Sequence, residues 1–269
     1  MSTYRGRLAP TPTGDLHSGH ARTFYHAWKR ARDANGRLFL RMEDLDTGRC
    51  KPRFARGILE DLKRLGLNWD GEPEYQSQHP ERYLHIWRHL KDQGSIYPCT
   101  RSRKEIQSLP RPPQEDEQDA EPIVPPEWRP SPGAEKAYDR PGGVTWRFRV
   151  PDGEVIRFTD ALCGEIALTA GRDFGDFSVW RRDNIPSYEL SVVVDDIHQK
   201  ITEVVRGRDL LTSTARQLLL YRALKTSPPS WCHQPLVRDA SGKRLSKRFH
   251  SRSVRSLLDA GTPLEDLFY

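Results

Sequence analysis

The sequence predicts an α/β protein whose parallel sheet, covered by helices, is interrupted by an insertion of roughly 80–90 residues. Strand-like runs and helix-like periodicities alternate over residues 5–94. A proline-rich acidic stretch and a strand-rich stretch then break this alternation, which resumes near residue 176. Such alternation is typical of parallel sheets, because helical crossovers connect neighbouring parallel strands.

The first 97 residues are predicted to alternate between strands and helices. Residues 5–9 form a short strand that enters a Pro/Gly loop, and "RLFLRMED" contains the second strand. Apolar residues at helical spacing predict helices over 21–31, 54–65 and 83–90. Asn35-Gly36, Gly66 and Gly94 follow these helices and are residue types that end helices.

The chain changes character after Tyr97. Residues 110–132 hold eight of the 21 prolines and the acidic cluster "EDEQDAE", so they are predicted to form an exposed, mobile loop. Apolar and polar side chains alternate from Val144 to Val150, which predicts a half-buried strand. "VIRFTDALCGEIALTA" predicts further strand and turn.

Sheet and helix return with "SYELSVVVDD", "ITEVVRG" and the predicted helix "TSTARQLLLYRALK". We therefore expect four parts along the chain. They are residues 1–97, the first half of the sheet domain; 98–175, the insertion; 176–238, the second half; and 239–269, a basic loop with a helical tail.

Composition limits the classes of protein that fit. Charged residues make up 30%, mean hydropathy is −0.76, and no apolar run approaches the roughly 18 residues of a membrane span, so we expect a soluble, cytoplasmic protein without a signal peptide. The four cysteines are widely scattered, which predicts neither a disulfide framework nor a zinc knuckle. The net charge of +6 modestly favours a polyanionic partner, although a merely soluble basic protein fits equally well.

The stretch "PTPTGDLHSGH" joins the first strand to the first helix. In this layout, loop backbone and a helix N-terminus face a ligand at the carboxyl edge of the sheet, where free N–H groups favour phosphate. His17 and His20 can hydrogen-bond phosphate oxygens there, and Gly19 leaves room for a base or ribose. Two histidines near a helix start are by themselves usually surface residues, so the signal lies in the whole string.

The second motif, "DASGKRLSKR", spans Asp239 to Arg248. A lysine on such a loop can pair with ATP phosphates as charge shifts during phosphoryl or nucleotidyl chemistry. Alone, the stretch is more often a solvated basic loop. Its value lies in its pairing with the N-terminal H-x-G-H motif.

Together the two motifs resemble those of class I aminoacyl-tRNA synthetases: "PTPTGDLHSGH" the HIGH signature, and "RLSKR" the KMSKS signature. "RLAPTPTG" is similar to the version in glutamyl-tRNA synthetases, and the resemblance continues through "RMEDLD" and "GDFSVWRRDNIPSYELSVVVDD". It implies a Rossmann-type parallel sheet with an α+β insertion and a short helical C-terminal tail. It also implies the use of ATP, Mg²⁺ and L-glutamate. We further expect a monomer that does not bind membranes.

Within this family the chain resembles a truncated subgroup, the glutamyl-Q tRNA(Asp) synthetases. Ordinary glutamyl-tRNA synthetases continue well beyond the KMSKS loop into a helical anticodon-binding region, whereas only residues 249–269 follow Arg248 here. The subgroup activates glutamate with ATP and esterifies queuosine in the anticodon loop of tRNA(Asp). The resemblance therefore implies tRNA(Asp) as the partner, with the insertion contacting it.

The sequence departs from the family at a zinc site of type C-x-C…Y-x3-C in the insertion. Cys99 is present, but Arg101 stands where the second cysteine belongs, and Trp128 lies near the position of the later one. A tetrahedral zinc site needs about four N or S ligands, so we predict no zinc and no other protein-bound metal. We expect Cys99 to be a buried apolar side chain, and packing around Trp128 or Trp146 to order this region unless it stays mobile.

A dicarboxylic amino acid needs cations for its carboxylates and an anion for its ammonium, and arginine suits carboxylates because its planar fork donates two parallel hydrogen bonds. The resemblance assigns Arg206 to the side-chain carboxylate and Glu43 to the ammonium. The full predicted glutamate site is Arg7, Ala9, Thr11, Glu43, Tyr188 and Arg206. Without the surrounding motifs, Arg7 and Glu43 would be interpreted as a surface ion pair and Tyr188 as a core aromatic.

The predicted catalytic residues are His17, His20 and Lys247, which would stabilise charge on the α-phosphate during adenylate formation. The predicted ATP-binding residues are Thr13, Gly14, His17, Gly19, His20, Arg244, Leu245, Ser246 and Lys247. Mg²⁺ would shield the leaving pyrophosphate. The candidates for RNA phosphate contact are Arg101, Arg103, Lys104, Arg252 and Arg255.

Three other functions remain open from the sequence. A truncated glutamyl-tRNA synthetase would share the activation step but charge a tRNA 3′ end. A non-catalytic paralogue would bind tRNA or a protein, although both motifs and the whole glutamate site are present. A different nucleotidyltransferase would have the HIGH-like loop without needing Arg7, Glu43, Tyr188 and Arg206 together.

Overall fold

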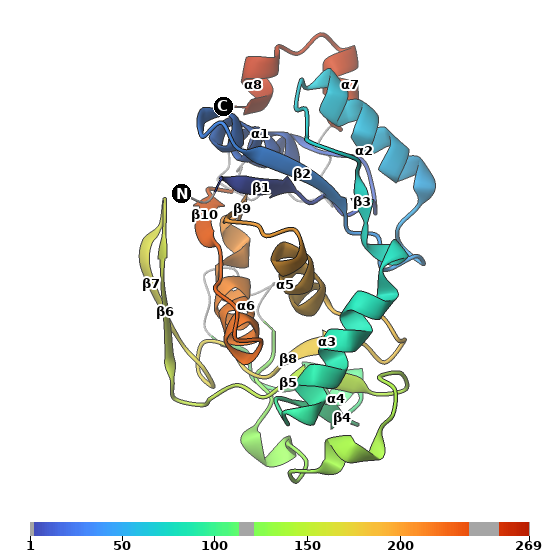
Figure 1. The fold of residues 1–269 in the computed structure, drawn as a ribbon, viewed down its shortest axis with the longest axis vertical. Helices are drawn as coiled ribbons and strands as arrows, with labels where there is room; N and C mark the ends of the chain where they lie inside the picture. The colour runs from blue at the N-terminus through green and yellow to red at the C-terminus, as the bar shows by residue number, and fades with distance from the viewer. Residues whose placement is uncertain (1–2, 113–120, 237–252, 269) are drawn as a thin grey trace.

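The structure is a computed structural model that describes residues 3–112, 121–236 and 253–268. It has the expected α/β fold, with parallel strands covered by helices. Figure 1 shows an elongated molecule, with β1–β3 and helices α1, α2, α7 and α8 at one end, α5 and α6 in the middle, and α3 with β4, β5 and β8 at the other end.

Two groups of parallel strands form the central sheet. One group consists of β1 (Arg5–Leu8), β2 (Arg37–Met42) and β3 (Glu74–Tyr75), and the other contains β9 (Glu203–Gly207) and β10 (Ser230–Gln234). The Thr202 N–H donates to the Arg5 carbonyl at 2.9 Å, which sets β9 beside β1. The strand order therefore runs from β1 to β2 on one side of the β1–β9 junction and from β9 to β10 on the other side.

The helices include the four that the sequence predicts, over 21–31, 54–65, 83–90 and 212–225. In chain order the helices are α1 (Ser18–Asp33), α2 (Pro52–Arg64), α3 (Pro80–Asp92), α4 (Arg103–Gln107), α5 (Tyr188–His198), α6 (Leu211–Ala223), α7 (Val254–Asp259) and α8 (Leu264–Phe268). Pro52 and Pro80 occupy first-turn positions, where proline's missing N–H costs no hydrogen bond. Gly66 and Gly94 follow α2 and α3 at φ of 72° and 70°, a left-handed conformation that glycine adopts readily.

The expected insertion contributes to two sheets. Strands β4 (Ile96–Cys99), β5 (Thr145–Phe148) and β8 (Phe177–Trp180) form a small antiparallel sheet. The hairpin of β6 (Val155–Asp160) and β7 (Gly164–Thr169) extends the central sheet, because β6 runs parallel to β10. Trp146 and Phe148 share one core with Leu190 and Leu220, so the inserted segment packs directly on the second half of the sheet domain.

The described part of the 110–132 segment is partly packed and partly exposed, so the prediction of an exposed loop fits residues such as Glu121 and Glu127 but not Val124. Val124 is only 2% exposed, and residues 126–128 form a short 3₁₀ helix. Arg129 bridges Asp152 (3.0 Å) and Asp176 (2.7 Å). The proline and acid content, from which exposure was predicted, does not reveal these partners.

Cys99 is buried, as expected, in a cluster with Tyr97, Ile106 and Val124, against which Trp128 packs. Arg101 lies over the Trp128 ring at 4.5 Å from its centroid. A cation–π contact therefore joins Arg101 and Trp128, the two residues expected in place of zinc-binding cysteines, and apolar packing surrounds Cys99.

The described C-terminal residues form the expected helical tail. Tyr25 of α1 stacks on Phe268 of α8 with ring centroids 4.1 Å apart. Figure 1 shows α7 and α8 (red) beside α1 and α2. Among the helices of the described ranges, none combines the length and apolarity needed to cross a membrane.

Candidate active site

A cavity of about 390 Å³ opens at the carboxyl edge of the parallel sheet. Residues at the ends of β1, β2 and β9 and at the starts of α1 and α5 form its walls. The cavity lies at the β1–β9 junction, from which the strand order runs in opposite directions. Ligands of open α/β sheets bind at such a switch point, because the loops diverge there and leave a crevice.

The structure brings the predicted residues together in this cavity. The residues predicted to bind glutamate that line it are Arg7, Ala9, Thr11, Glu43, Tyr188 and Arg206. The ATP-site residues that line it are Gly14, His17, Gly19 and His20. Thr13 is not part of the lining; its backbone N–H donates to the Thr11 carbonyl at 2.8 Å, within the loop turn. Arg244, Leu245, Ser246 and Lys247 lie outside the described residues.

The chain on both sides of the second motif is anchored at this cavity. Pro235 and Leu236, which line it, immediately precede residues 237–252. After that range, Ser253 forms a β-bridge with His17, and the Val254 N–H donates to the Leu16 carbonyl at 2.7 Å. The described chain therefore leaves and re-enters next to the histidine loop.

His17 and His20 stand at the start of α1. His17 is the N-cap residue, in extended conformation, and the two rings stack with centroids 3.6 Å apart. The His17 backbone N–H donates to His20 Nδ1 at 3.3 Å. Because Nδ1 accepts this bond, neutral His20 carries its proton on Nε2 and can donate it to an anion. The helix N-terminus adds to the attraction for negative charge.

Arg7 and Glu43 are held by a buried ion-pair network behind the cavity. Arg7 Nε donates to Asp196 Oδ1 at 3.4 Å, and Arg7 Nη1 donates to the Val205 carbonyl at 3.2 Å. The fully buried Arg41 donates to Asp196 at 2.7 Å and to Glu43 at 3.2 Å. Burial raises the pKa of the Glu43 carboxyl in spite of Arg41 and Arg7. The two arginines thus do not fully compensate the buried carboxylate, and a cationic ligand group beside Glu43 would stabilise its charged form.

Arg206 also lines the cavity, with only 5% of its surface exposed. It donates to His233 Nε2 (3.1 Å), Gln217 Oε1 (2.9 Å) and Thr214 Oγ1 (2.7 Å). Its Nη1 lies 3.5 Å from the Tyr188 hydroxyl. Loss of solvation raises the pKa of that hydroxyl to about 12, so at neutral pH it stays protonated and can donate a hydrogen bond.

We expect His233 to make the stability of the protein pH-dependent. Burial and the Arg206 charge lower its pKa to about 4, from 6.5. Between these values the unfolded chain binds more protons than the folded chain, so the free energy of unfolding rises with pH, by up to about 3 kcal/mol in total. Urea unfolding of the wild type and His233→Gln between pH 4 and 7 measures this contribution, since the other titrating groups cancel in the difference. Equal slopes would contradict it.

The sequence did not predict the buried residues that hydrogen-bond to the side chains lining the cavity. Arg41, Asp196 and His233 are buried and bind residues that line the cavity. The available signal was a charged residue inside an apolar run: Arg41 within "LFLRM", and Asp196 directly after "SVVVD". Charges in buried runs are almost always paired, although the sequence does not name the partner.

The candidate RNA-binding residues are placed differently from one another. Arg103 and Lys104 are exposed on α4. Arg101 lies over the Trp128 ring and donates a hydrogen bond to Glu105 Oε1 at 3.1 Å. Arg255 is ion-paired with α2, through Glu60 and Asp61, and Arg252 lies outside the described residues. Arg103 and Lys104 are therefore the better placed of these for a phosphate.

Comparison with known families gives an independent result. The profile of the family described as "tRNA synthetases class I (E and Q), catalytic domain" matches residues 3–267. A curated protein named glutamyl-Q tRNA(Asp) synthetase, from Nitratidesulfovibrio vulgaris, is 41% identical over 98% of this chain and 83% of its own length. A protein of the same name from Pseudomonas putida is 40% identical over 98% of this chain and 81% of its own.

Solved structures agree with the sequence comparison. The crystal structure of a glutamate tRNA ligase from Elizabethkingia meningosepticum, in complex with its amino acid, superposes with a TM-score of 0.77 at 26% identity. The match covers 97% of this chain and 54% of that one, so the chain spans about half the length of the ligase.

Proposed function

This chain belongs to the catalytic-domain family of the class I tRNA synthetases for glutamate and glutamine, and on that premise we propose that it activates L-glutamate with ATP and transfers it to queuosine in the anticodon loop of tRNA(Asp). It is an ATP-dependent ligase of the aminoacyl-tRNA synthetase type. The glutamyl-Q tRNA(Asp) synthetases to which it is similar support the choice of acceptor. The lining of the cavity supports the choice of amino acid.

One observation carries the proposal for glutamate: an acidic group and a buried guanidinium line the same cavity. Glu43 suits the ammonium, and Arg206 with the Tyr188 hydroxyl suits the side-chain carboxylate. Arg7 is available to the α-carboxylate end. The positive charge of a buried guanidinium favours a carboxylate over the neutral amide of glutamine.

Activation is a displacement at the α-phosphorus of ATP. An oxygen of the glutamate α-carboxylate attacks this phosphorus, the bond to the bridging oxygen of pyrophosphate breaks, and pyrophosphate leaves with that electron pair. Negative charge gathers on the non-bridging oxygens, where His17, His20 and Lys247 would stabilise it. No side chain forms a covalent bond, so catalysis consists of positioning and electrostatics.

Mg²⁺ would enter with ATP, held by the phosphates, and would shield charge on the leaving pyrophosphate. In the described part of the chain, no three or more His, Cys, Asp or Glu side chains are grouped so that they could hold a metal ion. The protein's own contribution near the phosphates comes from N–H donors at the start of α1 and from the cations of the second motif.

In the second step, a hydroxyl of the queuosine cyclopentene ring attacks the carbonyl carbon of glutamyl-adenylate. The hydroxyl loses its proton, and AMP leaves with the electrons of the broken C–O bond. An anticodon loop can present such a group because its bases can be splayed out, the usual target of specific RNA recognition. Phosphate contacts from Arg103 and Lys104 of α4 would make RNA binding weaken with salt.

Labelled glutamate tests the acceptor. We expect label from glutamate and ATP to enter tRNA(Asp) that contains queuosine, and not the same tRNA without it. Removing the 3′-terminal adenosine should leave labelling intact, since the proposed ester lies in the anticodon loop. Equal labelling of both tRNAs, or loss of labelling with the 3′ end, would instead support a truncated synthetase that charges the 3′ end.

A further inference from the structure

Every hydrogen-bond partner of Arg206 in the described chain is neutral. They are His233, Gln217, Thr214, Tyr188 and the Leu210 carbonyl. Arg7, by contrast, bonds directly to the carboxylate of Asp196. A buried guanidinium without a carboxylate partner keeps its full attraction for an anionic ligand, whereas a paired one has lost much of it.

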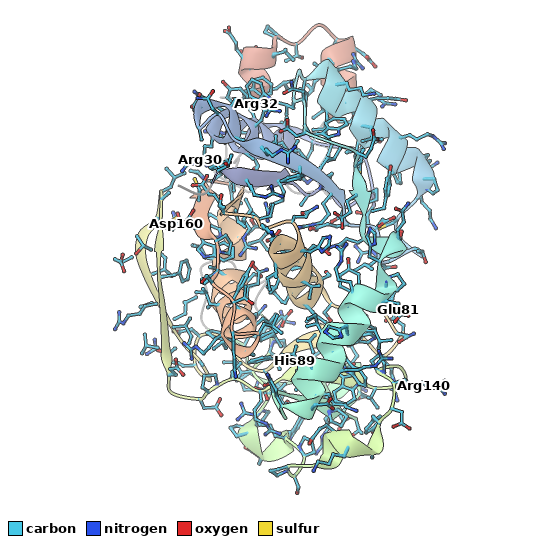
Figure 2. The ribbon with its side chains drawn as sticks, viewed as in Figure 1. Arg30, Arg32, Glu81, His89, Arg140 and Asp160 are labelled. Atoms are coloured by element: carbon cyan, nitrogen blue, oxygen red, sulfur yellow. The ribbon has the colours of Figure 1, made fainter. Side chains whose placement is uncertain are left out.

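One of these partners is held in a single tautomer. Arginine can only donate, so His233 Nε2 must accept from Arg206 and the ring proton must sit on Nδ1. Nδ1 donates this proton to Asp160 Oδ2 at an N···O distance of 2.7 Å, and both side chains are fully buried. Asp160 comes from the end of β6, which Figure 2 shows beside β10. The β6–β7 hairpin thus fixes the acceptor that faces Arg206.

A second partner is oriented in the same way. Gln217 Oε1 accepts from Arg206 at 2.9 Å, while Gln217 Nε2 donates to Glu189 Oε2 at 2.9 Å. Because a carboxylate accepts and a guanidinium donates, the amide cannot turn over. The other oxygen of Glu189, Oε1, lies 3.6 Å from Arg216, whose positive charge compensates that of the carboxylate.

We infer that Asp160 with His233, and Glu189 with Gln217, are two positioning pairs that select glutamate over glutamine. In each pair the carboxylate, of Asp160 or Glu189, does not contact Arg206. It orients a neutral side chain, His233 or Gln217, which accepts the hydrogen bond from Arg206. Arg206 is thereby fixed in place without being neutralised, and the substrate carboxylate becomes its counter-ion. The inference rests on the proposed activation of glutamate.

Exchanging the two members of one pair tests this directly. In the double variant Glu189→Gln/Gln217→Glu, the amide–carboxylate contact and the net charge are kept, but the carboxylate touches Arg206. We expect kcat/KM for glutamate, measured by ATP–pyrophosphate exchange in the presence of tRNA(Asp), to fall about 100-fold, mainly through KM. Exchange with glutamine should fall much less, so that the glutamate-to-glutamine ratio drops at least about tenfold.

The Asp160 pair has its own variant. Asp160 Oδ1 accepts the backbone N–H groups of Leu162 and Cys163, and Oδ2 faces His233 Nδ1. In Asp160→Asn the remaining Oδ1 can keep the bonds from Leu162 and Cys163 and accept the His233 backbone N–H, which is 3.3 Å away, while the amide N–H meets Nδ1 and shifts the ring proton to Nε2, toward Arg206. We expect KM for glutamate to rise about tenfold with a smaller change in kcat.

Glu72→Gln/Gln78→Glu makes the same two exchanges, without a change of net charge, at exposed positions that do not line the cavity, and serves as the control. Thermal unfolding checks that each variant folds. A folded double variant with the wild-type glutamate-to-glutamine ratio overturns the inference alone. A wild-type chain that shows no exchange with glutamate overturns the proposed function, and the inference falls with it.

Discussion

Replacing Arg206 with leucine is expected to lower kcat/KM for glutamate about 1000-fold in ATP–pyrophosphate exchange. The substrate's side-chain carboxylate would enter a cavity that has lost its cation, and truncating one partner of a buried charge pair costs about 4 kcal/mol. Arg206→Lys should recover little of this, because an ammonium cannot reproduce the planar set of hydrogen bonds that holds the guanidinium on His233, Gln217 and Thr214.

Arg208→Leu is the matched control, since Arg208 lies two residues away and is exposed. Leucine at position 206 also leaves His233 and Gln217 without their donor, so a somewhat lower unfolding midpoint is expected. If folded Arg206→Leu retains near-normal glutamate exchange, the carboxylate is bound elsewhere in the cavity.

Replacing Lys247 with alanine is expected to slow glutamate-dependent exchange by about 10²–10³-fold, mainly in kcat. The lysine lies outside the described residues, but the chain leaves the cavity at Leu236 and returns at Ser253 beside His17. A charge that acts on the α-phosphate in the transition state contributes little to binding of glutamate, whose KM should therefore change less.

His20→Ala should show the same pattern, because the imidazole serves the same phosphate oxygens from the start of α1. Lys225→Ala is a suitable comparison, since this exposed lysine follows α6 and does not line the cavity. Normal exchange by Lys247→Ala would contradict a role for the second motif in activation.

The sequence predicted those elements whose pattern is local. The first three long helices followed from apolar spacing and from the residues that end them, such as Gly66 and Gly94. "SYELSVVVDD" was harder to assign, because α5 is buried on nearly every side and shows no clear polar face. The pairing of β6 with β10 was not predictable, since it joins residues far apart in the chain and depends on which edge of the sheet is free.

In the candidate site, too, residues in short local motifs could be predicted and residues that act through long-range contacts could not. Arg7, Glu43 and Arg206 could be proposed because short motifs surround them, and they line one cavity. Asp160 and His233 could not, because neither stands in a motif and their function depends on contact across 73 positions. The acidic, proline-rich composition of residues 110–132 suggested exposure but could not reveal that Arg129 would bind Asp152 and Asp176.

The most direct test of the account is a crystal structure with a non-hydrolysable glutamyl-adenylate analogue. We expect its side-chain carboxylate on Arg206, its ammonium on Glu43, and its phosphate mimic beside His20 and within reach of Lys247. An analogue bound outside this cavity, or one inside it whose side-chain carboxylate turns away from Arg206, would contradict the account.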